Sequence, residues 1–134
     1  MRIDGGCFCG QITYEAEVDP GRVTICHCTD CQSLTGTAFR VTVQAPGEQF
    51  RISGAPAIFV KTAESGAKRE QAFCGTCGTH LYATSFGDGP KSYGIRVGTA
   101  RQRRELIPSK QVWHHSALPW ADQIGSLEAV AKGS

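Results

Sequence analysis

Apolar and polar residues alternate along most of the chain, with the period of two that is typical of half-buried strands. The alternation is clearest over residues 12–18, 39–43 and 93–97. Turn signals separate the alternating stretches, at Pro20-Gly21, Pro46-Gly47, Ser53-Gly54, Ser65-Gly66 and Gly87-Asp88-Gly89-Pro90. This spacing of strands and turns predicts a mainly β domain built from antiparallel sheets.

Helical periodicity is confined to two short stretches. The first is a helical turn from Thr29 to about Leu34, which Gly36 ends, and Asp30 is expected to cap it. The second is a weakly amphipathic stretch over residues 121–131, whose apolar positions fall at helical spacing: Ile124, Leu127 and Val130. The pattern therefore predicts a β domain with short helical turns.

The length of 134 residues suits one compact domain, expected over residues 1–131, followed by a C-terminal tail over residues 132–134. No stretch approaches the ~18 consecutive apolar residues of a membrane span, and the N-terminal residues lack the apolar run of an export signal. We therefore expect a cytoplasmic protein with no membrane partner. A formal net charge of +2 is too small to favour nucleic acid as a partner.

Seven cysteines are the unusual feature of the composition, because an odd number cannot be fully paired within one molecule and cytosolic thiols stay reduced. They fall into three close clusters: Cys7 and Cys9; Cys26, Cys28 and Cys31; Cys74 and Cys77. Such spacing is typical of ligands that share a metal ion. Metal binding is therefore favoured over a disulfide framework.

The first and third clusters predict a closed structural site. In an extended strand Cys7 and Cys9 project from the same face, and Cys74 and Cys77 have the CxxC spacing of a zinc knuckle, with glycines at 75 and 78. Together they supply four thiolates to one zinc ion and tie distant parts of the chain. The alternative is two unrelated thiol pairs.

The central cluster offers three thiolates, Cys26, Cys28 and Cys31, and no obvious fourth ligand. An open coordination position distinguishes a catalytic zinc site from a structural one. Three thiolates make the ion a weak Lewis acid toward water, so a soft fourth ligand is favoured. We therefore expect this zinc to hold a small thiol substrate as thiolate, ready to add to an electrophilic carbon or to leave it.

Several neighbouring residues have two interpretations. His27 is expected to project away from Cys26 and Cys28 and to pack or hydrogen-bond rather than ligate. His80 is a possible fourth ligand, although a structural role is the commoner one. The run Arg101, Arg103 and Arg104 is interpreted as a solvated segment, with Arg40, Lys68 and Arg69 as further candidates for contacts with an anionic substrate. Trp113 and Trp120 are interpreted as core residues.

The order of these motifs resembles the glutathione-dependent formaldehyde-activating enzyme (GFA) family, which includes the centromere-protein-V group. The resemblance covers nearly the whole chain and rests on these segments: Gly6-Cys7-Phe8-Cys9-Gly10, Cys26-His27-Cys28-Thr29-Asp30-Cys31, Phe73-Cys74-Gly75-Thr76-Cys77-Gly78-Thr79, Gly98-Thr99, Pro108 and Trp120. It implies a β-tent fold with a structural zinc on Cys7, Cys9, Cys74 and Cys77 and a second zinc on Cys26, Cys28 and Cys31. The activity it implies is that of a carbon-sulfur lyase, which forms or cleaves the adduct of glutathione with formaldehyde.

Two positions depart from the family pattern. Gln32 stands where many relatives have arginine, and Ala100-Arg101 replaces a Leu-Asp pair. Both changes concern substrate contacts, so the thiol and the carbonyl compound are left open. Two other function classes remain beside the enzyme: a carrier that binds a thiol without turning it over, and a zinc-stabilised module that binds a protein.

Overall fold

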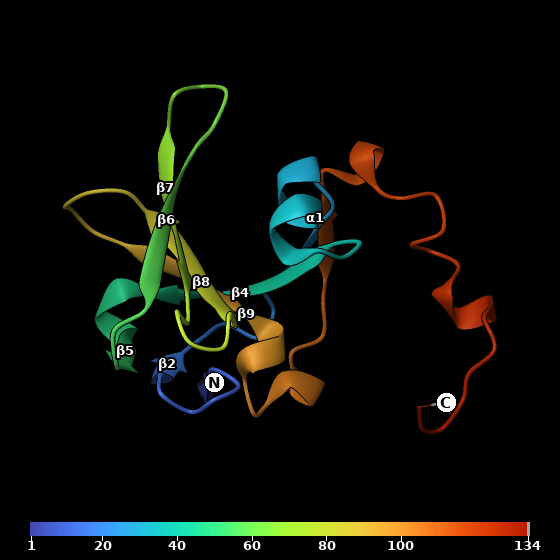
Figure 1. Cartoon of the computed structure of the whole chain (residues 1–134), viewed down its shortest axis with the longest axis horizontal. Coiled ribbons are helices and arrows are strands. Elements are labelled where there is room, and N and C mark those ends of the chain that lie inside the picture. Colours follow the sequence, from blue (N-terminus) through green and yellow to red (C-terminus); the bar gives the residue numbers. More distant parts are fainter. Residues whose placement is uncertain (134) are drawn as a thin grey trace.

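The computed structural model describes residues 1–133, which form ten strands, one α-helix and five short 3-10 turns (Figure 1). Part of the expected C-terminal tail, Ser134, lies outside the described residues. The strands form two sheets, and the mainly β fold with short helical turns is confirmed. Within the described residues, no helix has the length and apolar character needed to cross a membrane.

The smaller sheet has three antiparallel strands. Its order is β1 (Arg2–Gly6), β2 (Thr13–Glu17) and β5 (Phe50–Ser53), with β2 in the centre. The predicted alternation over residues 12–18 corresponds to β2, whose Tyr14 and Ala16 are buried while Thr13 and Glu17 face solvent. One face of this sheet therefore covers the core.

The larger sheet has seven strands in the order β10-β3-β4-β9-β8-β7-β6. Their bounds are β3 (Val23–Cys26), β4 (Arg40–Pro46), β6 (Ala57–Thr62), β7 (Lys68–Phe73), β8 (His80–Ser85), β9 (Ser92–Arg96) and β10 (Lys110–Val112). All neighbours are antiparallel except β10, which pairs in parallel with β3. The short strand β10 was not expected from the sequence.

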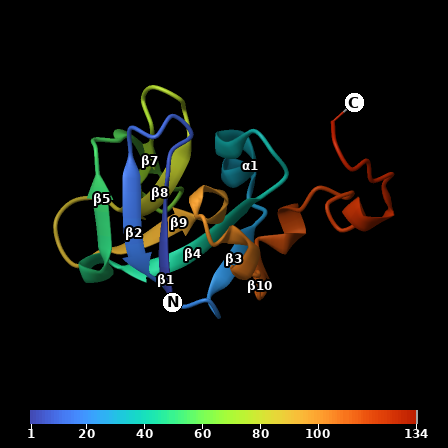
Figure 2. The same ribbon diagram turned by 90° about the horizontal axis from the view of Figure 1, so that it is seen from below.

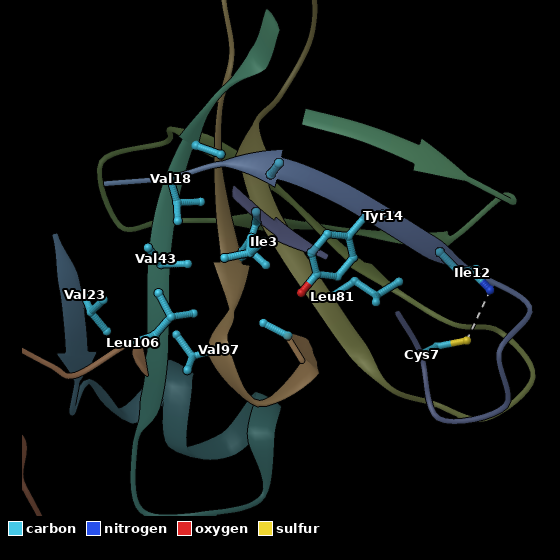
Figure 3. Packing of buried hydrophobic residues seen from close by; sticks show 14 of the residues in the cluster. Ile3, Cys7, Ile12, Tyr14, Val18, Val23, Val43, Leu81, Val97 and Leu106 are labelled. Atoms are coloured by element: carbon cyan, nitrogen blue, oxygen red, sulfur yellow. Dashed lines mark hydrogen bonds between the residues drawn. The ribbon is translucent and has the colours of Figure 1, made fainter. Parts of the chain in front are cut away.

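The core lies between the two sheets (Figure 3). Its fully buried members come from both sheets and from the loop before β10: Ile3, Val23, Val43, Leu81, Ile95 and Leu106. Val43 and Ile95 are cross-strand partners on the inward face of the larger sheet. The opposite face of that sheet is therefore left for other side chains, and the three-cysteine cluster lies on it.

The single α-helix, α1 (Thr29–Thr35), confirms the predicted helical turn. It ends at Gly36, which has a left-handed φ of 67° and donates its N–H to the Gln32 carbonyl. The cap at its beginning differs from the prediction. Cys28, not Asp30, is the N-cap residue, and its sulfur accepts a hydrogen bond from the Cys31 N–H at 3.3 Å.

The C-terminal segment differs from both predictions made for it. Residues 121–131 contain only the 3-10 turn Ile124–Ser126, and the apolar side chains expected on a helical face are exposed. A short amphipathic stretch needs a partner surface to become a helix, but this segment runs away from the sheets (Figures 1 and 2). Trp113 and Trp120 are more than half exposed, so neither is a core residue.

The other 3-10 turns are Gly47–Gln49, Val97–Thr99, Arg103–Glu105 and His114–Ser116. The turn Val97–Thr99 follows β9 directly. It is attached to the smaller sheet, because the hydroxyls of Thr99 and of Tyr14 on β2 are hydrogen-bonded at 2.8 Å. An isolated bridge between Gly5 and Ala100 adds a second link. The two sheets are therefore connected by this turn as well as by the core.

Candidate metal centres

Four cysteines from two turns that are distant in sequence lie together. Cys7 and Cys9 follow β1, and Cys74 and Cys77 lie in the connection between β7 and β8. Their four sulfurs lie within 4.8 Å of one another, with 3.6 Å from Cys7 to Cys9 and 3.7 Å from Cys9 to Cys74. Four thiol groups at this separation have the ligand number and spacing of a structural zinc site.

The way in which Cys7 and Cys9 converge differs from the prediction. They do not lie on an extended strand, because β1 ends at Gly6. The chain turns instead, and the Gly10 N–H donates to the Cys7 carbonyl at 3.1 Å. Phe8, at the tip of this turn, is almost fully exposed.

Backbone N–H groups point to the sulfurs of this four-cysteine cluster. Ile12 donates to the Cys7 sulfur at 3.3 Å (Figure 3), and Thr76 and Cys77 donate to the Cys74 sulfur at 3.4 and 3.5 Å. Such donors favour the thiolate over the thiol, and metal binding requires the thiolate. The backbone around Cys7 and Cys74 is therefore arranged to stabilise deprotonated sulfur.

The Cys77 thiol shows the same preference. Its sulfur lies 3.2 Å from the Thr79 hydroxyl. Hydrogen bonds from this hydroxyl and from backbone N–H groups lower the pKa of Cys77 to about 5. The turn that permits this arrangement passes through Gly78, whose φ of 78° is unfavourable for residues with a side chain. This local structure fits a metal knuckle.

The second group contains Cys26, Cys28 and Cys31, with sulfurs that also lie within 4.8 Å of one another. Cys26 ends β3, Cys28 begins α1 and Cys31 lies in its first turn, so the strand-to-helix connection brings all three together. Neither cysteine group includes a histidine or a carboxylate among the described residues. Three sulfur ligands would fit a soft divalent ion and leave one coordination position open.

Cys28 is the most acidic thiol of this three-cysteine cluster. Burial opposes its ionisation, but the pKa of Cys28 is lowered by the Cys31 N–H, by the other two thiols and by the positive charge of Lys61. Burial raises the pKa of Cys31 to about 12. Lys61, on β6, is held near the helix by an ion pair with Asp30 at 2.8 Å. The cluster thus has a cation beside it.

Three buried polar side chains next to the three-cysteine cluster complete the surroundings: Arg40 on β4, Arg96 on β9 and Gln71 on β7. Arg40 is the cross-strand partner of Cys26. Burial, followed by the nearby charge of Arg40, lowers the pKa of Arg96 to about 9. The sequence indicated Arg40 only as one of several candidate anion contacts, and it gave no reason to select Arg96 or Gln71.

The histidines occupy neighbouring positions without joining either cysteine group. His27 is buried, shares a 2.7 Å hydrogen bond with the Gln111 side chain and packs edge-on against Phe39 and His114. His80 stands beside Phe73, and burial, together with Arg40 and Arg96, lowers its pKa. His27 therefore packs and forms a hydrogen bond as expected, and His80 lies near Arg40 and Arg96.

The residues that depart from the family pattern have structural partners. Gln32 donates to the His27 carbonyl at 2.8 Å and to the Ser116 carbonyl at 3.0 Å, which ties α1 to the C-terminal segment. Ala100 is fully buried. The exposed Arg101 forms an ion pair with Asp4 at 3.1 Å, so the basic run begins at the smaller sheet and not at the cysteines.

The fold and the site together define a mainly β domain with a four-cysteine and a three-cysteine cluster. The family model for glutathione-dependent formaldehyde-activating enzyme matches residues 2–116, and the chain belongs to this GFA family. A Schizosaccharomyces pombe protein named as an uncharacterized lyase is 27% identical over 98 residues, which is 70% of this chain. The match covers 65% of the length of that relative.

A crystal structure of a Rhodobacter sphaeroides protein has the same fold. It superimposes with a TM-score of 0.62 at 21% identity, over 81% of this chain and 99% of the other. At this identity the likeness concerns the fold alone.

Proposed function

We propose that the protein is a zinc-dependent carbon-sulfur lyase that binds a small thiol, such as glutathione, and reversibly joins it to formaldehyde or another small carbonyl compound. The observation that carries the proposal is the three-cysteine cluster, which offers three soft ligands and leaves one position for a fourth. Membership of the GFA family and the lyase name of the yeast relative support the reaction class.

Two zinc ions per chain are part of the proposal. Cys7, Cys9, Cys74 and Cys77 would hold the structural ion, and Cys26, Cys28 and Cys31 would hold the catalytic one. When bound at the three cysteines, zinc would keep a substrate thiol ionised at neutral pH. The N–H groups directed at Cys7, Cys74 and Cys28 support both assignments, because hydrogen bonds from backbone N–H groups stabilise ligand thiolates.

The proposed reaction exchanges one bond for another without any oxidant. The thiolate sulfur forms a bond to the carbonyl carbon, the π electrons move to the oxygen, and that oxygen takes up a proton. The product is a hemithioacetal, which with formaldehyde is the S-hydroxymethyl adduct, and the reverse reaction releases the thiol and the carbonyl compound. One proton leaves the thiol and one reaches the oxygen, so the overall reaction consumes none.

The chain's contribution is to concentrate positive charge where the thiolate binds. Lys61 lies close enough to lower the pKa of Cys28, and Arg40 and Arg96 act on Cys31 and Cys26. The carboxylate of Asp30, which lies in the same region, is paired with Lys61. An incoming anion is therefore attracted to the cluster.

Cobalt substitution followed by thiol titration tests the proposal. Addition of glutathione to the cobalt-loaded protein is expected to change its visible spectrum, and NMR exchange spectroscopy is expected to show faster exchange between formaldehyde and its hemithioacetal than in protein-free buffer. Cys28→Ser is the test variant and should lose both effects, whereas the control His115→Phe keeps all seven cysteines and should keep both effects. Binding without faster exchange would indicate a thiol carrier, and no spectral change with any small thiol would exclude both functions.

A further inference from the structure

Arg40 and Arg96 form an unusual pair of buried cations on the outer face of the larger sheet. The two residues are only 6% and 9% exposed. They share one neutral acceptor, the Gln71 side-chain oxygen, at 3.4 Å from Arg40 Nη1 and 2.8 Å from Arg96 Nη2. Arg96 Nη1 also donates to the Thr42 hydroxyl at 3.2 Å. Two buried positive charges are thus held together by neutral groups.

No carboxylate among residues 1–133 forms an ion pair with either arginine. Three of their N–H-bearing atoms are buried without any hydrogen-bond partner: Arg40 Nε, Arg40 Nη2 and Arg96 Nε. Unpaired buried charge is strongly destabilising, so native proteins keep it where a ligand or partner supplies the opposite charge. Within the described residues, the pair therefore has no carboxylate partner.

The unpaired atoms of Arg40 indicate which kind of anion fits. Nε and Nη2 lie on the same edge of the guanidinium group, and this edge binds a carboxylate with two parallel hydrogen bonds. A single sulfur atom cannot accept both bonds in that geometry. The cluster's own sulfurs form no hydrogen bond with this edge either.

The location of the pair links it to the thiol site. Arg40 lies directly opposite Cys26 in the β3–β4 register, and Arg96 lies opposite Thr42, two residues along the same face of β4. Gln71 and Arg69 share this face of β7, and Lys61 is the cross-strand partner of Arg69. The charges around the cluster on this face are therefore basic, apart from Asp30, which Lys61 already pairs.

We propose that Arg40 and Arg96 bind a carboxylate of the thiol substrate beside the three-cysteine cluster, so that the enzyme selects acidic thiols. The inference rests on the proposed function, because it concerns the same substrate. It adds a substrate-binding role for two arginines and a substrate class, a thiol with a carboxylate within a few atoms of sulfur. Gln71 is a positioning residue that holds both guanidinium groups.

The test compares two matched thiols on the cobalt-loaded protein. They are 3-mercaptopropionate and 3-mercapto-1-propanol, which have the same chain length and differ in the carboxylate. Arg40→Gln is expected to weaken binding of 3-mercaptopropionate roughly 10- to 100-fold and to change binding of the alcohol by less than about threefold. Arg69→Gln, which removes an exposed cation from the same face, is the matched control and should have little effect on either thiol.

Gln71→Glu tests the same point in a protein that keeps its shape. The new carboxylate would occupy the arginine donors, so the variant is expected to lose the preference for 3-mercaptopropionate while it unfolds at a higher temperature than wild type. Equal weakening of both thiols in Arg40→Gln, or an unchanged preference in Gln71→Glu, would overturn the carboxylate assignment and leave the proposed function standing. Failure of both thiols to perturb cobalt in the wild-type protein would overturn the two proposals together.

Discussion

Cys74 and Cys28 both supply a sulfur to a cluster, but the structure around them differs. Cys74 is 1% exposed and its sulfur accepts two backbone N–H groups, whereas Cys28 is half-buried at the start of α1. Metal binding energy at a site that joins distant segments is folding energy. The two sites should therefore respond differently to removal of one ligand.

Cys74→Ala is expected to lower the free energy of unfolding by roughly 3 kcal/mol or more, because a metal site and its buried N–H partners are lost together. Cys28→Ala should cost about 1 kcal/mol, the usual value of an N-cap, while it abolishes thiol binding. Urea unfolding of both variants measures the difference. Equal, large losses would indicate two structural metals and favour a protein-binding module.

His80 is expected to make the protein sensitive to mild acid. Burial and the two arginines lower its pKa in the folded state, so on acidification the unfolded chain takes up a proton first, near its usual pKa of about 6.5. Stability due to neutral His80 is therefore complete above that pH and is lost as the pH falls toward the lower folded pKa.

Thermal unfolding of His80→Phe between pH 7.5 and 5, roughly one pKa unit either side of the usual value, measures this effect. The variant should lose less stability on acidification than the wild type. His115→Phe removes an exposed histidine and serves as the control, since both variants keep all seven cysteines. Identical pH profiles for His80→Phe and wild type would show that the histidine is not responsible.

Single residues could be predicted from the sequence where the chemistry is local. The three cysteine clusters follow from spacings of two or three residues, and Gly36 follows from its place after the helix. Arg96 could not be selected in this way, because its neighbours Gln71 and Arg40 reach it only through the pairing of separate strands. The capping role of Asp30 was wrong because the sulfur of Cys28 already occupies the cap.

At the level of elements, two glycines are required for different reasons, one for its backbone conformation and the other for close packing. Gly36 has a left-handed φ of 67°, and an added Cβ would meet open space. Gly5 on β1 has no such φ, but an added Cβ would lie 2.1 Å from the Thr99 carbonyl oxygen. The first glycine is required by the turn, and the second by the close approach of β1 to the Val97–Thr99 turn.

Gly36→Ala is therefore expected to lower the free energy of unfolding by about 1 kcal/mol, the usual destabilisation by a residue with a side chain in the left-handed conformation. Gly5→Ala should cost about 3 kcal/mol, because backbone atoms would have to separate to admit the methyl group. Chemical denaturation of the two variants checks the order. A smaller loss for Gly5→Ala than for Gly36→Ala would show that β1 can move away from the turn without cost.

Elements with strong local patterns were predictable, and those that depend on long-range pairing were not. The alternation over residues 12–18 and 93–97 corresponds to β2 and β9. β10 has three residues and pairs in parallel with β3, 86 positions earlier by the pairing of Lys110 with Thr24, so this pairing leaves no trace in the local sequence pattern. The helical spacing over residues 121–131 was misleading, because no surface covers its apolar side.

For the whole molecule, the four-cysteine cluster joins the turn after β1 to the connection between β7 and β8, segments separated by 65 positions between Cys9 and Cys74. The three-cysteine cluster lies within one strand-to-helix connection. If both clusters hold a metal as proposed, its removal from the first site would free a long loop, while removal from the second would affect only a local segment.

The purified protein is accordingly expected to contain two zinc ions of unequal lability. Mild chelation should remove the ion of the three-cysteine cluster first, because its open position admits the chelator, and the protein should remain folded. Stronger chelation should remove the second ion together with tertiary structure. Metal analysis combined with near-ultraviolet circular dichroism at each step follows both events.

The order in which the two clusters release metal depends on how easily a chelator reaches each one. Cys9 is exposed, so a chelator has some access to the four-cysteine cluster as well, but four ligands must be displaced there instead of three. Release of both ions in a single step, together with unfolding, would contradict this order and would mean that metal binding at the two clusters is cooperative. Visible absorbance in the isolated protein would instead indicate iron-sulfur ligation, and the assignment of zinc to either cluster would then be wrong.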